Sequence, residues 1–405
     1  MKAKRIGIVL LGFFFIQDLN AAGYFWYPHF RFSQSYNDNI RLRARNADDV
    51  WVSSIRPGVE VERLDESSSI KARAEWNVLR YTLDELNAFE HYYDLDLAHT
   101  GDRYRLDFSG NYKIQTTLTS ELTESGLLTQ LNRHQWLAAP TVTYQLTPLQ
   151  KVSLSYQFQD LNYEKKKNVS VFTDYRYHTL SGDWRYQWTP STELNITAFG
   201  SRYKPVDFSL HSDTLGLQAG VEHNFSETLQ AGALGGIRYT ISESNGEVVR
   251  GFTINSDGRI VPVLGKEKQS SKDVGFIFSG HLRKTLERGY SSIELSQNVA
   301  PQGTGGLVQR LQATFRLNYE LFEHWRGIFK ATALRNETIS SSDSLSNRTD
   351  RTYFSIAPEL RWQWTEEIFL GFAYTYRYQK YKSLDQAATS NEFMVRLIYQ
   401  PLRVR

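Results

Sequence analysis

The stretch Lys151-Val152-Ser153-Leu154-Ser155-Tyr156-Gln157-Phe158-Gln159 decides the fold, because polar residues occupy its odd positions and apolar residues its even positions. Residues 104–112 (YRLDFSGNY), 70–76 and 311–319 alternate in the same way. A period of two places successive side chains on opposite faces of a β-strand. Between residues 29 and 399 the pattern returns about eighteen times, which predicts an almost entirely β chain.

The connections between these stretches alternate between two lengths. Short polar turns such as 65–68 and 147–150 are followed, one strand later, by long loops such as 115–132 and 242–273. Outer-membrane barrels have short periplasmic turns and longer extracellular loops. The sequence therefore predicts one all-β domain over residues 23–405. We expect a transmembrane antiparallel β-barrel of about 18 strands in the outer membrane of a Gram-negative bacterium, with both chain ends in the periplasm.

The composition agrees with a barrel. Aromatic residues make up 14% of the chain although 22% of it is charged, a combination expected where only every second residue faces lipid. Cysteine is absent, which excludes thiolate metal sites and a lipidated N-terminal cysteine. The net charge of +3 gives no reason to expect a nucleic-acid partner.

Tyrosine and tryptophan gather near the expected strand ends, as in the interfacial girdles of a membrane barrel. The alternative is a soluble β-sandwich with buried aromatic residues, whose core is seldom so uniformly aromatic at strand ends. Beside short turns stand Tyr144, Trp184, Tyr186, Trp188, Trp362, Trp364 and Tyr399, and beside long loops stand Tyr112, Tyr163, Tyr203 and Tyr239.

Residues 1–22 have the pattern of a secretory signal peptide. Lys2, Lys4 and Arg5 precede an apolar run over 6–16, and small residues allow cleavage after Ala21 or Ala22. The alternative is a membrane anchor. The apolar run of about eleven residues is short of the roughly twenty that a spanning helix needs.

If the apolar positions face lipid, the alternate positions line the lumen. Arginine there attracts anions through its field and binds carboxylates through two parallel hydrogen bonds. The alternative is a lumen of mixed, mutually paired charges. The expected lumen-lining charge track consists of Arg73, Arg103, Arg105, Arg316, Arg361 and Arg377.

Two long loops stand out. In 242–273, extended runs flank a turn at Ser256-Asp257-Gly258, which predicts a hairpin either standing outside the cell or folded into the pore. The loop 115–132 carries leucines at helical spacing, consistent with a short lid helix or, as the preferred interpretation, a packed surface helix. These leucines are Leu118, Leu122, Leu127, Leu128 and Leu131.

The sequence gives little support for catalysis. The nine histidines are scattered without an H-E-x-x-H spacing, and no G-x-S-x-G motif is present. We therefore expect no enzyme activity, no catalytic residues, no cofactor and no metal site.

Several stretches resemble the second class of β-barrel porins, an outer-membrane β-barrel family associated with exopolysaccharide gene clusters. They include Ser35-Tyr36-Asn37-Asp38-Asn39-Ile40, Arg56-Pro57-Gly58-Val59-Glu60-Val61, Ala357-Pro358-Glu359-Leu360 and Ser390-Asn391-Glu392-Phe393. The resemblance implies an outer-membrane location and a part in polysaccharide export, and it supplies no catalytic residues. The last strand, 393–399, is also similar to the C-terminal signal of the barrel-assembly machinery, although six residues follow Tyr399.

The leading functional hypothesis is a channel that exports an acidic exopolysaccharide. The alternatives are a porin for small-molecule diffusion and a barrel scaffold whose surface loops mediate adhesion. The expected partners are outer-membrane lipids, lipopolysaccharide and the barrel-assembly machinery. Polysaccharide and periplasmic export proteins join them only under the export hypothesis.

Overall fold

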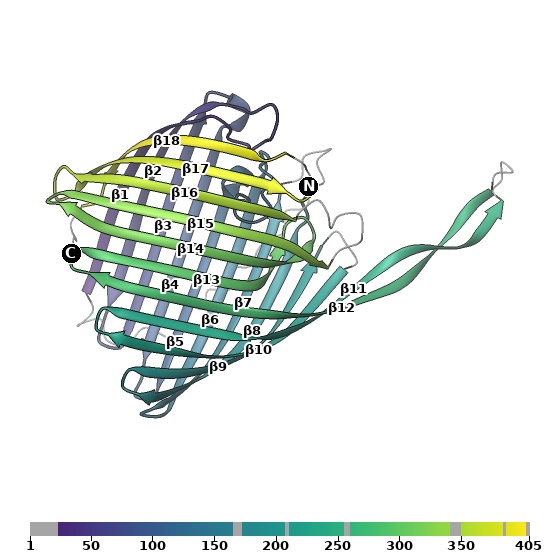
Figure 1. The fold of residues 1–405 in the computed structure, drawn as a ribbon, viewed down its shortest axis with the longest axis horizontal. Coiled ribbons are helices and arrows are strands. Elements are labelled where there is room, and N and C mark those ends of the chain that lie inside the picture. The colour runs from purple at the N-terminus through teal and green to yellow at the C-terminus, as the bar shows by residue number, and fades with distance from the viewer. Residues whose placement is uncertain are drawn as a thin grey trace.

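The chain forms one closed antiparallel barrel of 18 strands (Figure 1). The computed structural model describes residues 23–164, 172–206, 210–254, 260–340, 350–383 and 386–401, and for 244–254, 260–269 and 340 it describes the backbone only. Each strand pairs with its neighbours in sequence, and β1 pairs with both β2 and β18, which closes the ring. The predicted fold class and strand number are confirmed.

The strands range from 12 to 27 residues, so each meets the roughly 9–11 residues that cross a bilayer. Turns of two to four residues follow the even-numbered strands, and the longer loops follow odd-numbered ones. The strands are β1 (Gly23–Asn37), β2 (Val50–Leu64), β3 (Ser68–Tyr81), β4 (Ala88–Thr100), β5 (Tyr104–Thr116), β6 (Asn132–Thr147), β7 (Gln150–Tyr163), β8 (Tyr175–Thr189), β9 (Thr192–Pro205), β10 (Leu210–Ser226), β11 (Leu229–Ile254), β12 (Ile260–Leu286), β13 (Gly289–Gln302), β14 (Gly306–Phe322), β15 (Trp325–Ser340), β16 (Arg351–Gln363), β17 (Ile368–Tyr381) and β18 (Ala388–Tyr399). Two short helices, η1 (Asp84–Leu86) and α1 (Thr117–Ser120), lie in the loops after β3 and β5.

The ring closes where the two ends of the chain meet. β1 pairs with β2 over fifteen residue pairs, but with β18 over only eight, from Phe30 opposite Tyr399 to Asn37 opposite Glu392. Residues 23–29 therefore pair on one side only. Pro28 lies in this part, where a residue without a backbone N–H is tolerated. The first strand thus begins six residues before the expected position 29.

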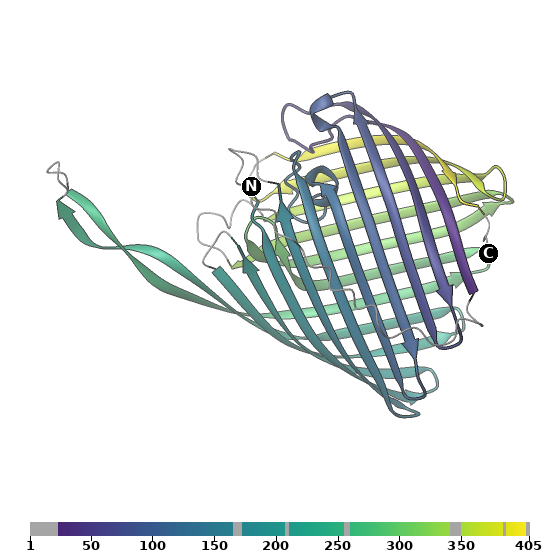
Figure 2. The same ribbon diagram turned by 180° about the vertical axis from the view of Figure 1, so that it is seen from behind.

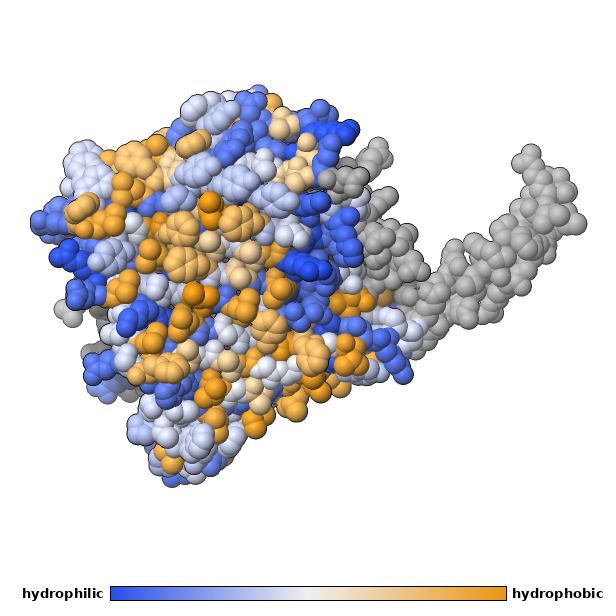
Figure 3. All heavy atoms as spheres, in the orientation of Figure 1, coloured by the Kyte–Doolittle hydropathy of each residue, from blue (hydrophilic) through white to orange (hydrophobic). Residues whose placement is uncertain are grey.

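The outer surface is apolar and aromatic. Trp26, Leu154, Leu215 and Phe393 are about half exposed or more, at the positions that the alternation assigns to the outer face. Figure 3 shows hydrophobic residues spread over the strands, with hydrophilic residues gathered toward both ends of the barrel. An apolar belt on a closed barrel, in which every strand is paired on both sides, is the way in which β-sheets cross a bilayer. The protein is an outer-membrane β-barrel.

No helix of the described chain has the length and hydrophobicity needed to cross a membrane.

β11 and β12 continue well beyond their neighbours as a two-stranded ribbon. Their pairing runs to Ile254 opposite Ile260, and the ribbon leads away from the barrel (Figures 1 and 2). Most of the expected loop 242–273 is therefore strand, and the hairpin stands outside the barrel and not in the pore. The predicted turn at 256–258 lies outside the described residues, as does the predicted signal segment 1–22.

Candidate functional site

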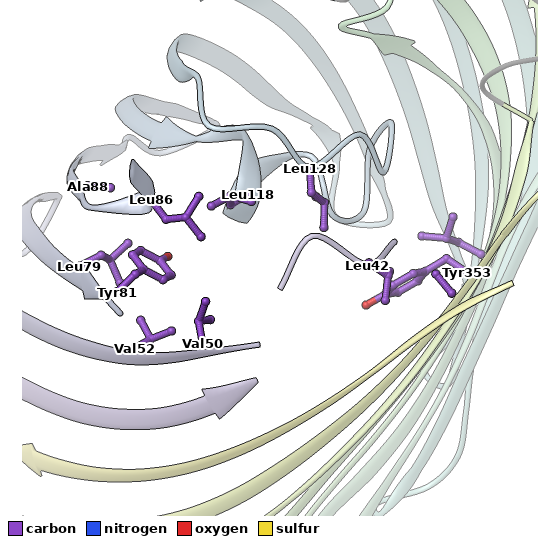
Figure 4. Close-up of a cluster of buried hydrophobic side chains, with 12 residues drawn as sticks. Leu42, Val50, Val52, Leu79, Tyr81, Leu86, Ala88, Leu118, Leu128 and Tyr353 are labelled. Atoms are coloured by element: carbon purple, nitrogen blue, oxygen red, sulfur yellow. The ribbon is translucent and has the colours of Figure 1, made fainter. Parts of the chain in front are cut away.

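The loop between β5 and β6 folds into the barrel. We call residues 117–131 the crossing segment. Its two ends are held together because the backbone N–H of Thr117 donates to the carbonyl oxygen of Leu131 at 2.9 Å. Helical structure is limited to the four residues of α1, so the preferred expectation of a packed surface helix is wrong. The segment lies at the end of the barrel that carries the long loops, and Figure 4 shows part of it inside the barrel wall.

The middle of the crossing segment is anchored to the opposite wall. One guanidinium nitrogen of Arg351, at the start of β16, donates to the carbonyl oxygens of Leu122 and Glu124 at 2.8 and 3.2 Å. Asn336 on β15 also donates to the Glu124 carbonyl, at 2.7 Å. The hydroxyl of Tyr381 on β17 donates to the carbonyl of Ser125 at 3.2 Å. These strands lie six to eight places from β5 by the shorter way round the ring of 18, close to the maximum of nine, so the segment spans the lumen.

A buried polar cluster holds the segment at its own wall. Glu121 is fully buried and accepts from Arg133 at 3.2 Å and from the hydroxyl of Tyr163 at 2.7 Å. Arg133, itself 2% exposed, also contacts Glu124 at 2.9 Å. Because burying a charge is costly unless it is paired, removing one partner here would leave the other uncompensated. Burial is the main cause that raises the pKa of the Glu124 carboxyl, and the negative charge of Glu121 adds to it, while Arg133 acts in the opposite direction.

Leucines of the crossing segment pack against the inner face of the barrel wall at two separate groups of strands. Leu118 and Leu128 belong to a cluster with side chains from β2, β3, η1 and β4 and with others from β15, β16 and β18 (Figure 4). Its wall members are Val50, Val52, Leu79, Tyr81, Leu86, Ala88, Leu334, Tyr353 and Ala388, with Leu42 from the first loop. A second cluster surrounds Leu131 and comprises Leu161, Tyr163, Phe172, Tyr175, Tyr203 and Leu307. Each fully buried leucine contributes about 1.5–3 kcal/mol to docking.

Two of the expected girdle tyrosines face inward instead. Tyr163 and Tyr203 are 5% and 0% exposed and pack in the second cluster. The girdle prediction is wrong for these two tyrosines, because both occupy odd positions and the odd positions of β7 and β9 point into the lumen. Trp188 and Trp364 are exposed as girdle residues should be, at 65% and 59%. Apolar residues at lumen positions near the long loops were the sequence signal for a segment folded inside.

The six predicted arginines do not form one continuous row. Arg103 lies in the turn between β4 and β5, outside the strands, and is exposed. The other five lie on strands, and each is hydrogen bonded to a carboxylate. Arg361 and Arg377 lie on adjacent strands, whereas β5 and β14, which carry Arg105 and Arg316, lie on opposite sides of the ring. The pairs are Arg73–Glu75, Arg105–Asp107, Arg316–Glu294, Arg361–Glu359 and Arg377–Glu392.

Two other lumen arginines have no such partner. Arg31 on β1 and Arg56 on β2 are directly opposite in the strand register. Within the described chain neither forms a salt bridge, and the buried Nε atom of Arg31 has no hydrogen-bond partner. The guanidinium of Arg56 lies 4.9 Å from the ring centre of Tyr92. The charge track omitted both, although the alternation in β1 and β2 places them inside.

A cavity of about 350 Å³ lies between these arginines and the crossing segment. Its lining includes Arg31, Arg56, Arg377 and Arg396 from the wall, and Leu118, Leu122 and Leu128 from the crossing segment. Within the described residues no group of His, Asp and Glu side chains is arranged to hold a metal ion. The guanidinium groups of this lining can donate hydrogen bonds to an anion.

No protein-family model matches the chain, and no curated protein matches its sequence. Among solved structures it is similar to Acinetobacter baumannii OccAB4, with 10% identity over 94% of this chain and 98% of that one and a TM-score of 0.47. Pseudomonas aeruginosa OpdO is similar at 11% identity over 94% and 98% of the two chains, with a TM-score of 0.46. The ferric-catecholate import receptor Fiu of Escherichia coli K12 matches at 7% identity over 92% and 81%, with a TM-score of 0.47. These likenesses concern barrel architecture alone.

Proposed function

We propose that this protein is a passive outer-membrane channel for small solutes. The observation that carries the proposal is the crossing segment, which spans the lumen and is hydrogen bonded to the opposite wall through Arg351 and Asn336. A barrel of this strand number encloses an aqueous lumen unless loops fill it. A segment fixed across that lumen narrows it, which suits solutes much smaller than the barrel.

The crossing segment also argues against the two alternative functions. Export of an acidic exopolysaccharide, which the family resemblance suggested, requires a continuous chain to pass. The contacts of Glu121, Leu128 and Arg351 would have to break for this. An adhesion scaffold would use the projecting β11–β12 ribbon and needs no lumen at all. Neither alternative explains why polar groups inside the barrel are arranged to hold a loop across it, and neither catalysis nor a cofactor is part of the proposal.

The salt bridges of the lumen arginines affect the preference of the channel for anions. Arginines paired with carboxylates contribute little net field, so Arg105 and Arg316 are poor candidates for attracting anions. Arg31 and Arg56 form no salt bridge among the described residues, so they are the arginines expected to give the channel its preference. The channel is therefore expected to favour anions modestly, with the selective step close to β1 and β2.

The test uses the purified full-length barrel in planar bilayers and in solute-loaded liposomes. The wild-type protein should give small stepwise currents and admit only small solutes. Replacing residues 118–130 by a short glycine–serine linker should raise the conductance severalfold, because Thr117 and Leu131 are already adjacent and the strands need not move. The matched control replaces residues 250–263 of the projecting β11–β12 ribbon by the same linker, because Val249 and Leu264 are paired and the ribbon leads away from the barrel (Figure 1). Absence of current from both wild-type and linker proteins would overturn the proposal, and so would passage of polysaccharide through the wild type.

A further inference from the structure

The cavity beside Arg31 and Arg56 has two kinds of lining. Four arginines face it, namely Arg31, Arg56, Arg377 and Arg396, against a single carboxylate, Glu392. Its other side is formed by aliphatic side chains of the crossing segment and of the first loop. The wall also contributes Ser33, Ser35, Ser54 and Ser390 and the apolar Val52, Leu79, Tyr81 and Met394, and Asn39 and Thr119 lie among the aliphatic residues opposite. The arginines and the aliphatic side chains thus lie on facing sides of a mixed lining.

The positive charge in the cavity is not neutralised from within. Glu392 forms a salt bridge with Arg377 at 2.5 Å. Arg396 must share Glu359, at 3.4 Å, with Arg361 at 3.0 Å. Among the described residues, Arg31 and Arg56 therefore form no salt bridge, and Arg396 shares its carboxylate with Arg361.

The neighbouring carboxylate Glu75 does not change this balance. It is close enough to act electrostatically on both Arg31 and Arg56, but it accepts a hydrogen bond from Arg73 and lies 2.7 Å from the His29 ring nitrogen. Like charges directly opposite on adjacent strands destabilise a sheet. The juxtaposition of Arg31 and Arg56 is thus a cost to the barrel that a bound anion would offset.

The hydrocarbon side is equally specific. Leu118 and Leu128 are 5% and 7% exposed, and Ile40 and Leu122 pack against the same cluster. These aliphatic side chains offer no hydrogen bond to a ligand, so the part of a ligand that they contact is expected to be apolar. Burial of such a body removes apolar surface from water, which favours binding.

From these two linings we propose that the cavity is a binding site for a small monocarboxylate with an apolar body, the carboxylate against Arg31 and Arg56 and the body against the leucines. The inference adds a class of solute to the proposed channel function, and it rests on that function only for the passage of the bound solute. A guanidinium binds a carboxylate through two parallel hydrogen bonds. The arginines of the site are partly exposed to the lumen, with the side chains of Arg377 and Arg396 19% and 23% exposed, so a bound solute can leave as well as enter, as conduction requires.

The experiment measures binding without ion flow. Radiolabelled hexanoate is equilibrated with the barrel in lipid nanodiscs, and empty nanodiscs are the blank. Acetate keeps the charge and lacks the body, and hexanamide keeps the body and lacks the charge. Each is expected to bind at least tenfold more weakly than hexanoate, because one loses several buried methylenes and the other the charge-assisted hydrogen bonds.

The variant carrying Arg31→Gln and Arg56→Gln should bind hexanoate at least tenfold more weakly, and it should fold normally because it relieves a like-charge pair. Arg185→Gln is the matched control, since Arg185 lies on β8 away from the cavity, and its affinity should equal that of the wild type. Wild-type binding no greater than that of empty nanodiscs would overturn the site, as would equal binding of acetate or hexanamide or an unchanged double variant. A barrel that binds hexanoate but conducts nothing would overturn only the channel function, and a conducting barrel that binds none would overturn only the site.

Discussion

Arg351 on β16 holds the carbonyl oxygen of Leu122 at 2.8 Å, although 229 residues separate the two along the chain. The same nitrogen reaches Glu124, so one side chain contributes both contacts. Replacing Arg351 by methionine keeps the length and removes the donors. Docking of the crossing segment should weaken by about 2–4 kcal/mol, from two hydrogen bonds of a charged donor. Single-channel recordings should then show a larger and noisier current. An Arg185→Met barrel should behave as wild type, and a quiet wild-type current from Arg351→Met would refute this anchoring role.

The docking of the crossing segment should depend on pH through Glu124. Burial and Glu121 raise the pKa of this carboxyl above its ordinary value of 4.5, so the docked segment retains a proton that the undocked segment loses. Docking is therefore strongest below pH 4.5 and weakens as the pH rises through the raised pKa. Conductance measured from about pH 4 to about pH 8 should increase with pH. Glu124→Gln, which mimics the protonated form, should remove the dependence, and an identical pH profile in this variant would contradict the assignment.

The leucines of the segment should be required for docking and not for the barrel. Leu128→Ala removes a side chain that is 7% exposed, which typically costs about 2–5 kcal/mol. Limited proteolysis should cut the variant within 117–131 at a higher rate than the wild type. The folded barrel should still resist heating on a gel, because strand pairing is untouched. Leu149→Ala, at a turn position 52% exposed, should leave both measurements unchanged.

Two adjacent glycines of β11 should respond differently to alanine. A Cβ atom on Gly236 would lie 1.9 Å from the carbonyl oxygen of Leu217 on β10, so the two strands would have to move apart. A Cβ atom on Gly235 would meet no heavy atom within 4 Å. Refolding yield into lipid vesicles should fall markedly for Gly236→Ala and remain near wild type for Gly235→Ala. Equal yields would show that the barrel accommodates the contact.

The barrel was predictable because its determinants are local. The alternation in residues 151–159 is enough to predict that Leu154 and Tyr156 face the lipid. The lengths of the turns then predict the order of the strands. Eighteen strands follow from counting these repeats. The exposed girdle residues Trp188 and Trp364 were predictable for the same reason.

The interior was less predictable because distant residues decide it. Whether Leu118 and Leu128 pack on a surface or inside a lumen depends on Arg351 and Tyr353, which follow more than 200 residues later. The alternation indicated that Arg73 and Arg377 face inward but not that Glu75 and Glu392 neutralise them. Tyr163 was assigned to the girdle from its place beside a loop, although its odd position already indicated the lumen.

The joint between β1 and β18 has a mechanical consequence. Its eight residue pairs are the fewest of any joint in the ring, and Pro28 lies just beyond them. Force applied along the chain ends would load this joint first, and shear would be resisted there by about half the hydrogen bonds that join β1 to β2. The barrel should therefore unzip from the β1–β18 joint when it is pulled from a membrane, one hairpin after another, with the crossing segment still bridging the remaining strands.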